Sequence, residues 1–123
     1  MSVKKILVVD DSAVERYYLS DALNKRGYTV YEAVDGDDAI TKAKAVMPDL
    51  ILMDVVMPGA NGFQVTRSIS RDETLAHIPI FMCTSKDQET DRVWGMRQGA
   101  KDYLTKPVNI DELTEKIGQL AAS

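Results

Sequence analysis

Four short apolar runs in this chain each stop at residues that can take part in phosphoryl chemistry. The residues at which they stop are Asp10-Asp11, Asp54, Thr84-Ser85 and Lys106-Pro107. Carboxylates hold Mg²⁺, and an aspartate can itself accept a phosphoryl group as an acyl phosphate. A hydroxyl and an ammonium group can bond the phosphoryl oxygens. Brought together, these groups would form a site for Mg²⁺ and a phosphoryl group, with Asp54 as the nucleophile.

The apolar runs themselves indicate how these residues could meet. They are Ile6–Val9, Leu50–Met53, Ile80–Cys83 and Tyr103–Thr105, and none has a helical period. Short runs of this kind are typical of buried strands in a parallel sheet. Ligands of open α/β sheets bind beyond the carboxyl ends of the strands. If the four strands lie side by side, the polar residues that follow them share one rim.

Strand and helix patterns alternate along the whole chain. Strands are expected at Lys5–Val9, Thr29–Ala33, Leu50–Met53, Ile80–Cys83 and Asp102–Thr105, and helices at Ala13–Lys25, Asp37–Val46, Phe63–Ser70, Asp87–Gln98 and Ile110–Leu120. This order predicts an α/β fold, a doubly wound five-stranded parallel sheet with helices on both faces, as one domain over residues 1–123. We expect Asn61-Gly62 to be a turn.

The fourth predicted helix has an irregular apolar pattern. We expect Val93, Met96 and Ala100 to face inward, and Trp94 to lie half exposed at the edge of that stripe. Gly95 would cost the helix about 1 kcal/mol relative to alanine. It could reflect sequence drift, which we favour, or it could keep a switching helix loose.

Composition excludes several functional classes. The net charge of −4 over 123 residues argues against non-specific nucleic-acid binding. The single cysteine, Cys83, lies within an apolar run and is interpreted as a small core residue rather than a metal ligand. No segment approaches the ~20 apolar residues of a membrane helix, and we expect no membrane insertion and a cytoplasmic location.

Taken singly, each candidate residue has a simpler explanation. Asp10-Asp11 could be a polar turn or a helix cap, and Asp54 a loop carboxylate. Thr84 could cap the following helix, and Lys106 could be a solvated surface lysine. The phosphoryl interpretation is favoured because all of them follow strands on one predicted rim and their chemistries are complementary.

This combination resembles the signature of bacterial response-regulator receiver domains, the CheY-like family. The residues that carry the resemblance are Asp10-Asp11, Asp54 with Met57-Pro58-Gly59, Thr84 and Lys106-Pro107, and it extends over essentially the whole chain. The resemblance implies the strand order 2-1-3-4-5 and phosphorylation of Asp54 by a partner histidine kinase.

The resemblance also implies roles for the other residues of the rim. Asp11 and Asp54 would ligate Mg²⁺, Asp10 would support the metal through water, and the backbone carbonyl of Val56 would be a further ligand. Lys106 would pair with the phosphoryl oxygens.

A conformational switch is implied in the same way. Thr84 would move its hydroxyl toward the phosphoryl group, and Tyr103 would rotate inward with it. The Lys106–Pro107 peptide bond would be cis. Output would pass through a protein partner at a surface that includes Arg92, Trp94 and Tyr103, the protein being a monomer or weak dimer with no output domain. The stretch Thr84–Gly95 resembles PilH-type single-domain regulators of type IV pilus twitching.

Two rival functions, a metal-dependent phosphatase and an FMN carrier, each lack a residue pattern that they would need. A haloacid dehalogenase-like phosphatase needs an aspartate two residues after its nucleophile, and this chain has Val56 there. A flavodoxin-like FMN carrier needs a phosphate-binding loop of Ser, Thr and Gly after the first strand, where Asp10-Asp11 stand instead.

Overall fold

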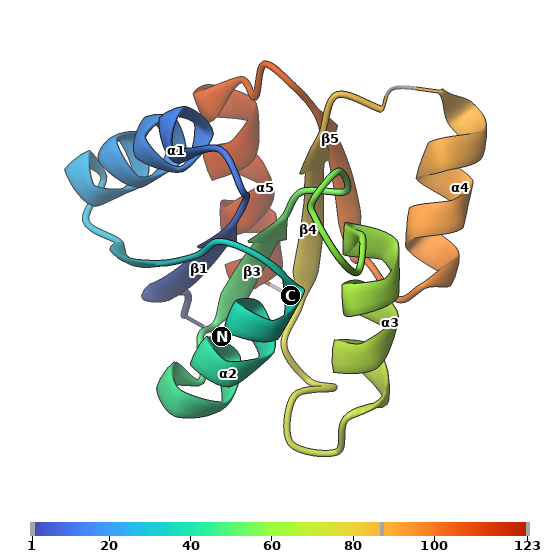
Figure 1. The fold of residues 1–123 in the computed structure, drawn as a ribbon. Coiled ribbons are helices and arrows are strands. Elements are labelled where there is room, and N and C mark those ends of the chain that lie inside the picture. The colour runs from blue at the N-terminus through green and yellow to red at the C-terminus, as the bar shows by residue number, and fades with distance from the viewer. Residues whose placement is uncertain (1, 87, 123) are drawn as a thin grey trace.

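Strands and helices alternate along the part of the chain that the computed structural model describes, residues 2–86 and 88–122 (Figure 1). The strands are β1 (Lys5–Val9), β2 (Thr29–Ala33), β3 (Leu50–Met53), β4 (Ile80–Thr84) and β5 (Asp102–Thr105). The helices are α1 (Ala13–Lys25), α2 (Gly36–Val46), α3 (Gly62–Arg71), α4 (Glu89–Arg97) and α5 (Ile110–Ala122). The alternation predicted from the apolar runs is therefore confirmed, with differences of one or two residues at element ends.

All strands pair in parallel in the order β2-β1-β3-β4-β5. This is the doubly wound order that the resemblance implied. Strand β1 lies between β2 and β3, so the strand order reverses beside β1. Open α/β sheets bind their ligands beyond the carboxyl ends of the strands at such a point.

The sheet is buried on both faces, because successive strand residues point to opposite sides. Leu7, Val9, Ile51 and Met53 pack with side chains of α2 and α3 in one core cluster. Ile6, Val8, Leu50 and Leu52 pack with side chains of α1 and α5 in the other. Figure 1 shows α1 and α5 on one side of the sheet and α2, α3 and α4 on the opposite side.

Helix α3 begins at a well-formed cap rather than after a turn. The Asn61 side chain accepts a hydrogen bond from the Gln64 backbone N–H at 3.0 Å, and the Gln64 side chain accepts one from the Asn61 N–H at 2.9 Å. This reciprocal pair is a capping box. The expectation of a turn at Asn61-Gly62 is therefore wrong: Asn61 is the N-cap and Gly62 is the first helical residue.

Helix α4 packs on the rest of the molecule differently from its predicted pattern. Val93 and Met96 are 41% and 42% exposed, so the expected inward stripe is wrong at both positions, although Ala100 beyond the helix is buried. Only Gly95 of α4 is buried. Its missing side chain lets the helix approach the rings of Phe63 and Tyr103, which would lie 3.3 Å from an added Cβ. Asp87, the predicted start of this helix, lies outside the described residues.

Candidate functional site

Strand pairing continues past the last strand residues and aligns the rim. The Asp54 N–H donates to the carbonyl of Val9 at 3.0 Å, just as β1 and β3 end. The Lys106 N–H donates to the carbonyl of Thr84 at 2.8 Å, just beyond the paired ends of β4 and β5. The order of the strands thus brings the predicted residues of all four runs to the same edge.

Three carboxylates gather at this edge. Asp10, Asp11 and Asp54 each place an oxygen within 4.8 Å of the other two. Asp10 and Asp54 are buried, whereas Asp11 is exposed at the mouth of the site. A hard divalent cation takes oxygen ligands of this kind, keeps some of its water and accepts phosphate oxygens. The donor set therefore fits such an ion.

Lys106 supplies the positive charge of the rim. Its Nζ lies 2.6 Å from Oδ2 of Asp10 and 3.5 Å from Oδ1 of Asp54, and its side chain is only 15% exposed. The explanation of Lys106 as a solvated surface lysine is therefore wrong. One ammonium group between two buried carboxylates leaves a local excess of negative charge.

The pKa values reflect this excess. Burial raises the pKa of Asp54, the nearby charge of Asp10 raises it further, and the ammonium of Lys106 only partly opposes these effects. Burial alone would lower the pKa of Lys106, but its hydrogen bond to Asp10 and the charge of Asp54 outweigh burial and raise it. Lys106 therefore stays protonated, and the surroundings of Asp54 favour a cation beside its carboxyl group.

Two further residues hold Asp10 in place. The Arg16 Nη1 donates to the backbone carbonyl of Asp10 at 2.7 Å, while its Nε pairs with Glu32 at 3.0 Å. The backbone N–H of Ser12 donates to Oδ1 of Asp10 at 2.9 Å. Sequence reasoning gave Arg16 no role, because no motif marks a helix residue that turns back to a strand end.

Gly62 fixes the backbone on the other side of the site. A Cβ at this position would overlap the carbonyl oxygen of Asp54 and lie 2.9 Å from Cα of Val55. The Gly62 N–H donates to the carbonyl of Val55 at 2.9 Å. The first turn of α3 therefore rests directly on the Asp54 backbone, which only glycine permits.

Thr84 and Tyr103 lie beside the rim and are joined through Lys86. Thr84 is fully buried, and its Oγ1 accepts a hydrogen bond from the Lys86 N–H at 3.3 Å. Thr84 does not cap α4, whose N-cap is Gln88. The Tyr103 hydroxyl donates to the Lys86 carbonyl at 2.6 Å, and Tyr103 is 2% exposed. The ring therefore already occupies an inward position in this structure.

The residues expected at an output surface lie in two different environments. Arg92 contacts Tyr103, with its Nη2 3.3 Å from the Tyr103 carbonyl and its guanidinium 5.6 Å from the ring centre. Trp94 instead lines a pocket between α3 and α4. Because Tyr103 is buried, it contributes almost no surface of its own. Val56, next to the rim, is 58% exposed, and the Lys106–Pro107 bond is cis.

Among the helices in the described residues, none is both long enough and apolar enough to cross a membrane.

Comparison with known proteins gives relatives along nearly the full chain. Protein PilH of Pseudomonas aeruginosa is 50% identical over 118 residues, which cover 96% of this chain and 98% of PilH. The response regulator PleD of Caulobacter vibrioides is 43% identical over 105 residues, which cover 85% of this chain but only 23% of PleD.

Solved structures are similar as well. A putative response regulator from Chloroflexus aurantiacus superposes with a TM-score of 0.92 at 28% identity, covering 99% of this chain and 100% of that chain. The chemotaxis protein CheY4 of Vibrio cholerae superposes with a TM-score of 0.89 at 32% identity, covering 96% and 98% of the two chains. The family model described as the response regulator receiver domain matches residues 6–118. The chain therefore belongs to the response regulator receiver domain family.

Proposed function

We propose that this chain is a phosphorylation-controlled switch in which Asp54 accepts a phosphoryl group from the phosphohistidine of a partner kinase. The observation that carries the proposal is the position of Asp54 between two other carboxylates and the ammonium group of Lys106. Asp54 is buried at the end of β3, where its N–H bonds the last residue of β1, whereas Asp11 is exposed.

In the proposed transfer, a carboxylate oxygen of Asp54 forms a bond to phosphorus as the nitrogen–phosphorus bond of the donor histidine breaks. Asp10, Asp11, Asp54 and the carbonyl of Val56 would hold Mg²⁺, which when bound offsets the carboxylate charge that would otherwise repel a phosphoryl group. Transfer of this kind depends mainly on positioning and neutralised charge. Lys106, 3.5 Å from Asp54, is placed to bond a phosphoryl oxygen after transfer.

The phosphorylated state would be read through Thr84 and Tyr103. If the Thr84 hydroxyl moves to donate a hydrogen bond to the phosphoryl group, the bond that its oxygen now accepts from the Lys86 N–H would be stretched or broken. Lys86 also accepts the hydrogen bond of the Tyr103 hydroxyl, so a shift of this segment reaches Tyr103 and the α4 residues packed on it. The outcome is a shift between two conformations that differ in affinity for a partner protein.

The similarity to PilH supports a pathway as well as a mechanism. We propose that the chain works in a chemotaxis-like system that controls type IV pilus twitching, in the cytoplasm, with a histidine kinase as donor. Its own chemistry would be limited to gaining and losing one phosphoryl group, with output by protein–protein contact from a monomer or weak dimer.

Intact mass measurement after incubation with acetyl phosphate and Mg²⁺ tests the proposal. Wild type should gain one phosphate, and Asp54→Asn should gain none. Labelling should fail in EDTA and in Asp11→Asn, whereas Asp37→Asn, an exposed residue with the same change of charge, should label normally. Labelling of Asp54→Asn would place the acceptor elsewhere. Steady hydrolysis of many equivalents of donor, without a labelled intermediate, would favour a phosphatase.

A further inference from the structure

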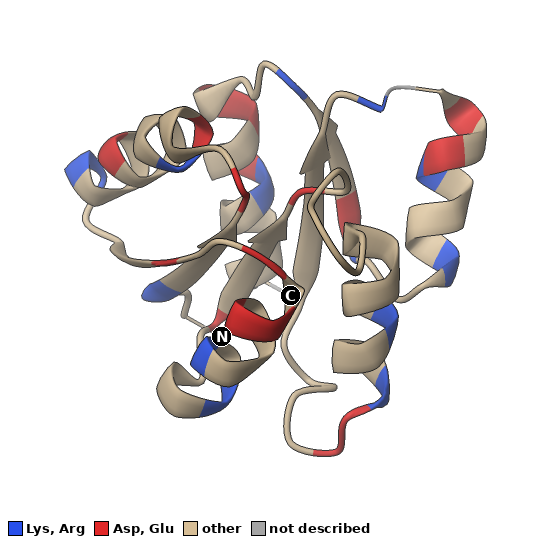
Figure 2. Ribbon diagram, in the orientation of Figure 1, with Lys and Arg blue, Asp and Glu red and all other residues tan. Residues whose placement is uncertain are grey.

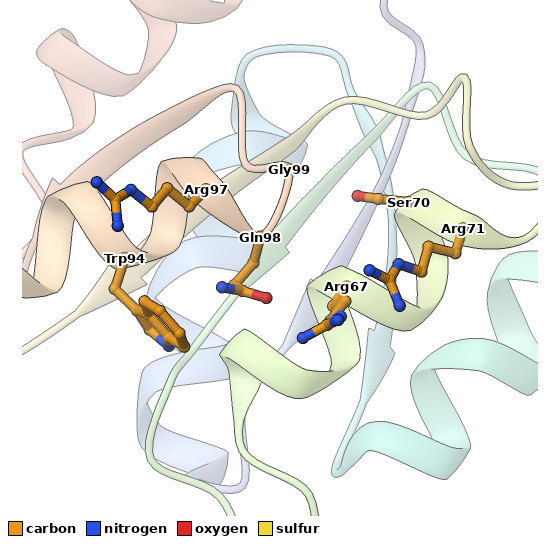
Figure 3. Close-up of a pocket in the computed structure, with 7 residues that line it drawn as sticks. All are labelled: Arg67, Ser70, Arg71, Trp94, Arg97, Gln98 and Gly99. Carbon is orange, nitrogen blue, oxygen red and sulfur yellow. The ribbon is translucent and has the colours of Figure 1, made fainter.

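A pocket of about 410 Å³ lies between α3 and α4, away from the acidic rim. Its lining residues are Arg67, Ser70 and Arg71 of α3 and Trp94, Arg97, Gln98 and Gly99 at the end of α4 and just beyond it (Figure 3). We refer to this set as the α3–α4 groove. It contains the only tryptophan of the chain, so fluorescence can report on it directly.

The groove is basic in an acidic protein. Three of its lining residues are arginines and none is a carboxylate, although the chain has a net charge of −4. Across residues 2–86 and 88–122, no carboxylate pairs with Arg67, Arg71 or Arg97 within 4.0 Å. Figure 2 shows basic residues on the later turns of both helices, whereas α4 begins with acidic residues. The groove therefore has positive charge that the protein does not neutralise.

The side chains are arranged to meet a ligand from outside. Figure 3 shows Arg67 and Arg71 extending from α3 toward Gln98 and Trp94, while the guanidinium of Arg97 points away from α3. One end of the groove is closed where the two segments touch. Gly99 has a φ of 113°, and a Cβ there would lie 2.9 Å from Cβ of Ser70. The spacing of the walls is thus set at this end by a contact that a larger residue would not allow.

We propose that the α3–α4 groove docks an acidic segment of a partner protein. Carboxylates of that segment bond the guanidinium forks of Arg67 and Arg71, whose geometry matches a carboxylate. An apolar side chain of the segment packs on Trp94, which is 49% exposed. Tryptophan and arginine are the residue types that most often dominate protein interfaces.

The openness of the groove favours a protein over a small molecule. All three arginines and Trp94 are exposed, whereas small ligands are usually enclosed over most of their surface. A chain segment that lies along the groove can use charges on both α3 residues and continue onto the neighbouring surface of α4.

One turn of α4 carries both Trp94 of the groove and Gly95, which packs on the proposed switch residue Tyr103. The expectation that phosphorylation regulates docking rests on the proposed function. Gly95, next to Trp94, contacts the rings of both Phe63 of α3 and Tyr103 of β5. A change in the position of Tyr103 therefore acts on the turn of α4 that carries the tryptophan. Docking of the acidic segment then differs between the unphosphorylated and phosphorylated states.

Selection from a phage-displayed library of random 12-residue peptides, on the immobilised full chain, tests the chemistry of the groove. The expected peptides are rich in Asp and Glu and contain a large apolar residue. The most enriched peptide, labelled with fluorescein, is then the probe in polarisation measurements. Peptides without an acidic bias would overturn the proposal.

Two pairs of variants locate the binding. The double variant Arg67→Gln/Arg71→Gln should weaken the probe at least about tenfold, because charged hydrogen bonds are lost. Lys4→Gln/Arg26→Gln removes the same charge from exposed positions elsewhere and should change the affinity less than about twofold. Trp94→Ala should weaken binding, and Val93→Ala, a neighbour outside the groove, should not. Equal binding by both members of either pair would overturn the proposal.

Further readouts separate the possible failures. The arginine variants should keep the wild-type circular dichroism spectrum and should still gain one phosphate. Trp94 emission should change on addition of the probe; a change with ATP or pyrophosphate but not with the probe would mean a small-molecule site and overturn the proposal. Phosphorylation should alter the affinity of wild type at least about threefold and leave Asp54→Asn unaffected. If the protein gains no phosphate, the proposed function is contradicted, but peptide binding to the groove is unaffected by that result. If the protein gains phosphate and binds no peptide, only the proposal for the groove is contradicted.

Discussion

Helices α3 and α4 cover the same face of the sheet but are held to it very differently. Five residues of α3 are buried, and the helix starts at a capping box with both hydrogen bonds formed. One residue of α4 is buried, and its N-cap Gln88 makes no side-chain hydrogen bond to the helix. Within the described residues, α3 is anchored by buried side chains along its length, whereas the only buried residue of α4 is a glycine.

In the proposed switch, α3 lies beside the reacting carboxylate and α4 lies beside the residue that reports phosphorylation. Helix α3 touches the backbone of Asp54 through Gly62, so the reacting carboxylate has a fixed wall. Helix α4 contacts Tyr103 through Gly95 and Arg92. The helix beside the proposed switch residue is therefore the one with fewer buried side chains. A site for chemistry needs preorganised groups, whereas a readout needs an element that can move at low cost in free energy.

Gly62→Ala should have the largest effect on stability and labelling, because it disrupts the contact between α3 and the Asp54 backbone. The added Cβ would overlap the Asp54 carbonyl, and the nearest atoms are all backbone atoms of Asp54 and Val55, so no flexible side chain can move aside. We expect a loss of at least about 3 kcal/mol in the free energy of unfolding, together with loss of labelling by acetyl phosphate. Urea denaturation and intact mass measure the two effects.

Gly118→Ala is the matched control for this substitution. Gly118 lies within α5 and has no atom within 4 Å of an added Cβ, so alanine should stabilise the protein by about 0.5–1 kcal/mol. If Gly62→Ala also proved neutral, α3 would not be the rigid partner of Asp54.

Asp54→Asn should stabilise the metal-free protein by about 1 kcal/mol at pH 7. The change removes a buried negative charge beside Asp10, and Lys106 keeps Asp10 as its partner. The pKa of Asp54 is raised in the folded state, so the unfolded chain loses this proton first as the pH rises. The charged carboxylate then costs stability, and the cost is complete above the folded pKa. Below the ordinary pKa both states are protonated and the gain should vanish.

Urea denaturation of both proteins in EDTA, from roughly pH 3 to pH 7, measures this difference. A gain that stays constant across the range would mean that the effect comes from packing rather than charge. Saturating Mg²⁺ should reduce the advantage of the variant, because the ion would stabilise wild type through the carboxylates.

The sequence alone was sufficient for most of the fold, because short apolar runs and their flanking residues mark buried strands unambiguously when they alternate with amphipathic helices. It also predicted which residues gather at the rim, since Asp10, Asp54 and Lys106 all follow strands of one parallel sheet. These are consequences of local pattern and of a simple rule of topology.

What the sequence did not reveal depends on contacts between distant segments. Gly62 looked like part of a turn and Gly95 like drift, but both are places where another segment comes too close for a side chain. The inward stripe of α4 failed for the same reason: a helix that approaches through a glycine leaves Val93 and Met96 in solvent. The unpaired arginines of the α3–α4 groove could be found only once α3 and α4 were placed side by side.

Substitutions at the N-caps of α3 and α4 test the same difference in anchoring, with smaller expected changes in stability. Asn61→Ala removes a formed cap and should cost about 1 kcal/mol, whereas Gln88→Ala removes no cap hydrogen bond and should change stability by less than about 0.3 kcal/mol. Gln88→Asp should stabilise the protein by about 0.5 kcal/mol, because aspartate can accept from a free N–H at the start of α4. Thermal denaturation measures all three. An equal loss from Asn61→Ala and Gln88→Ala would contradict the difference in anchoring.

Gly95→Ala should have only a small effect on stability and is the most direct test of α4. Alanine favours a helix over glycine by about 1 kcal/mol, while the new Cβ, 3.3 Å from the rings of Phe63 and Tyr103, requires a small shift. Because little else of α4 is buried, the helix can move outward by a few tenths of an ångström, and the net change in the free energy of unfolding should stay within about 0.5 kcal/mol. The shift should still alter Trp94 emission, since that residue adjoins Gly95. A loss above about 2 kcal/mol would mean that α4 is packed as rigidly as α3, and a helix so fixed would be a poor candidate for the moving part of the switch.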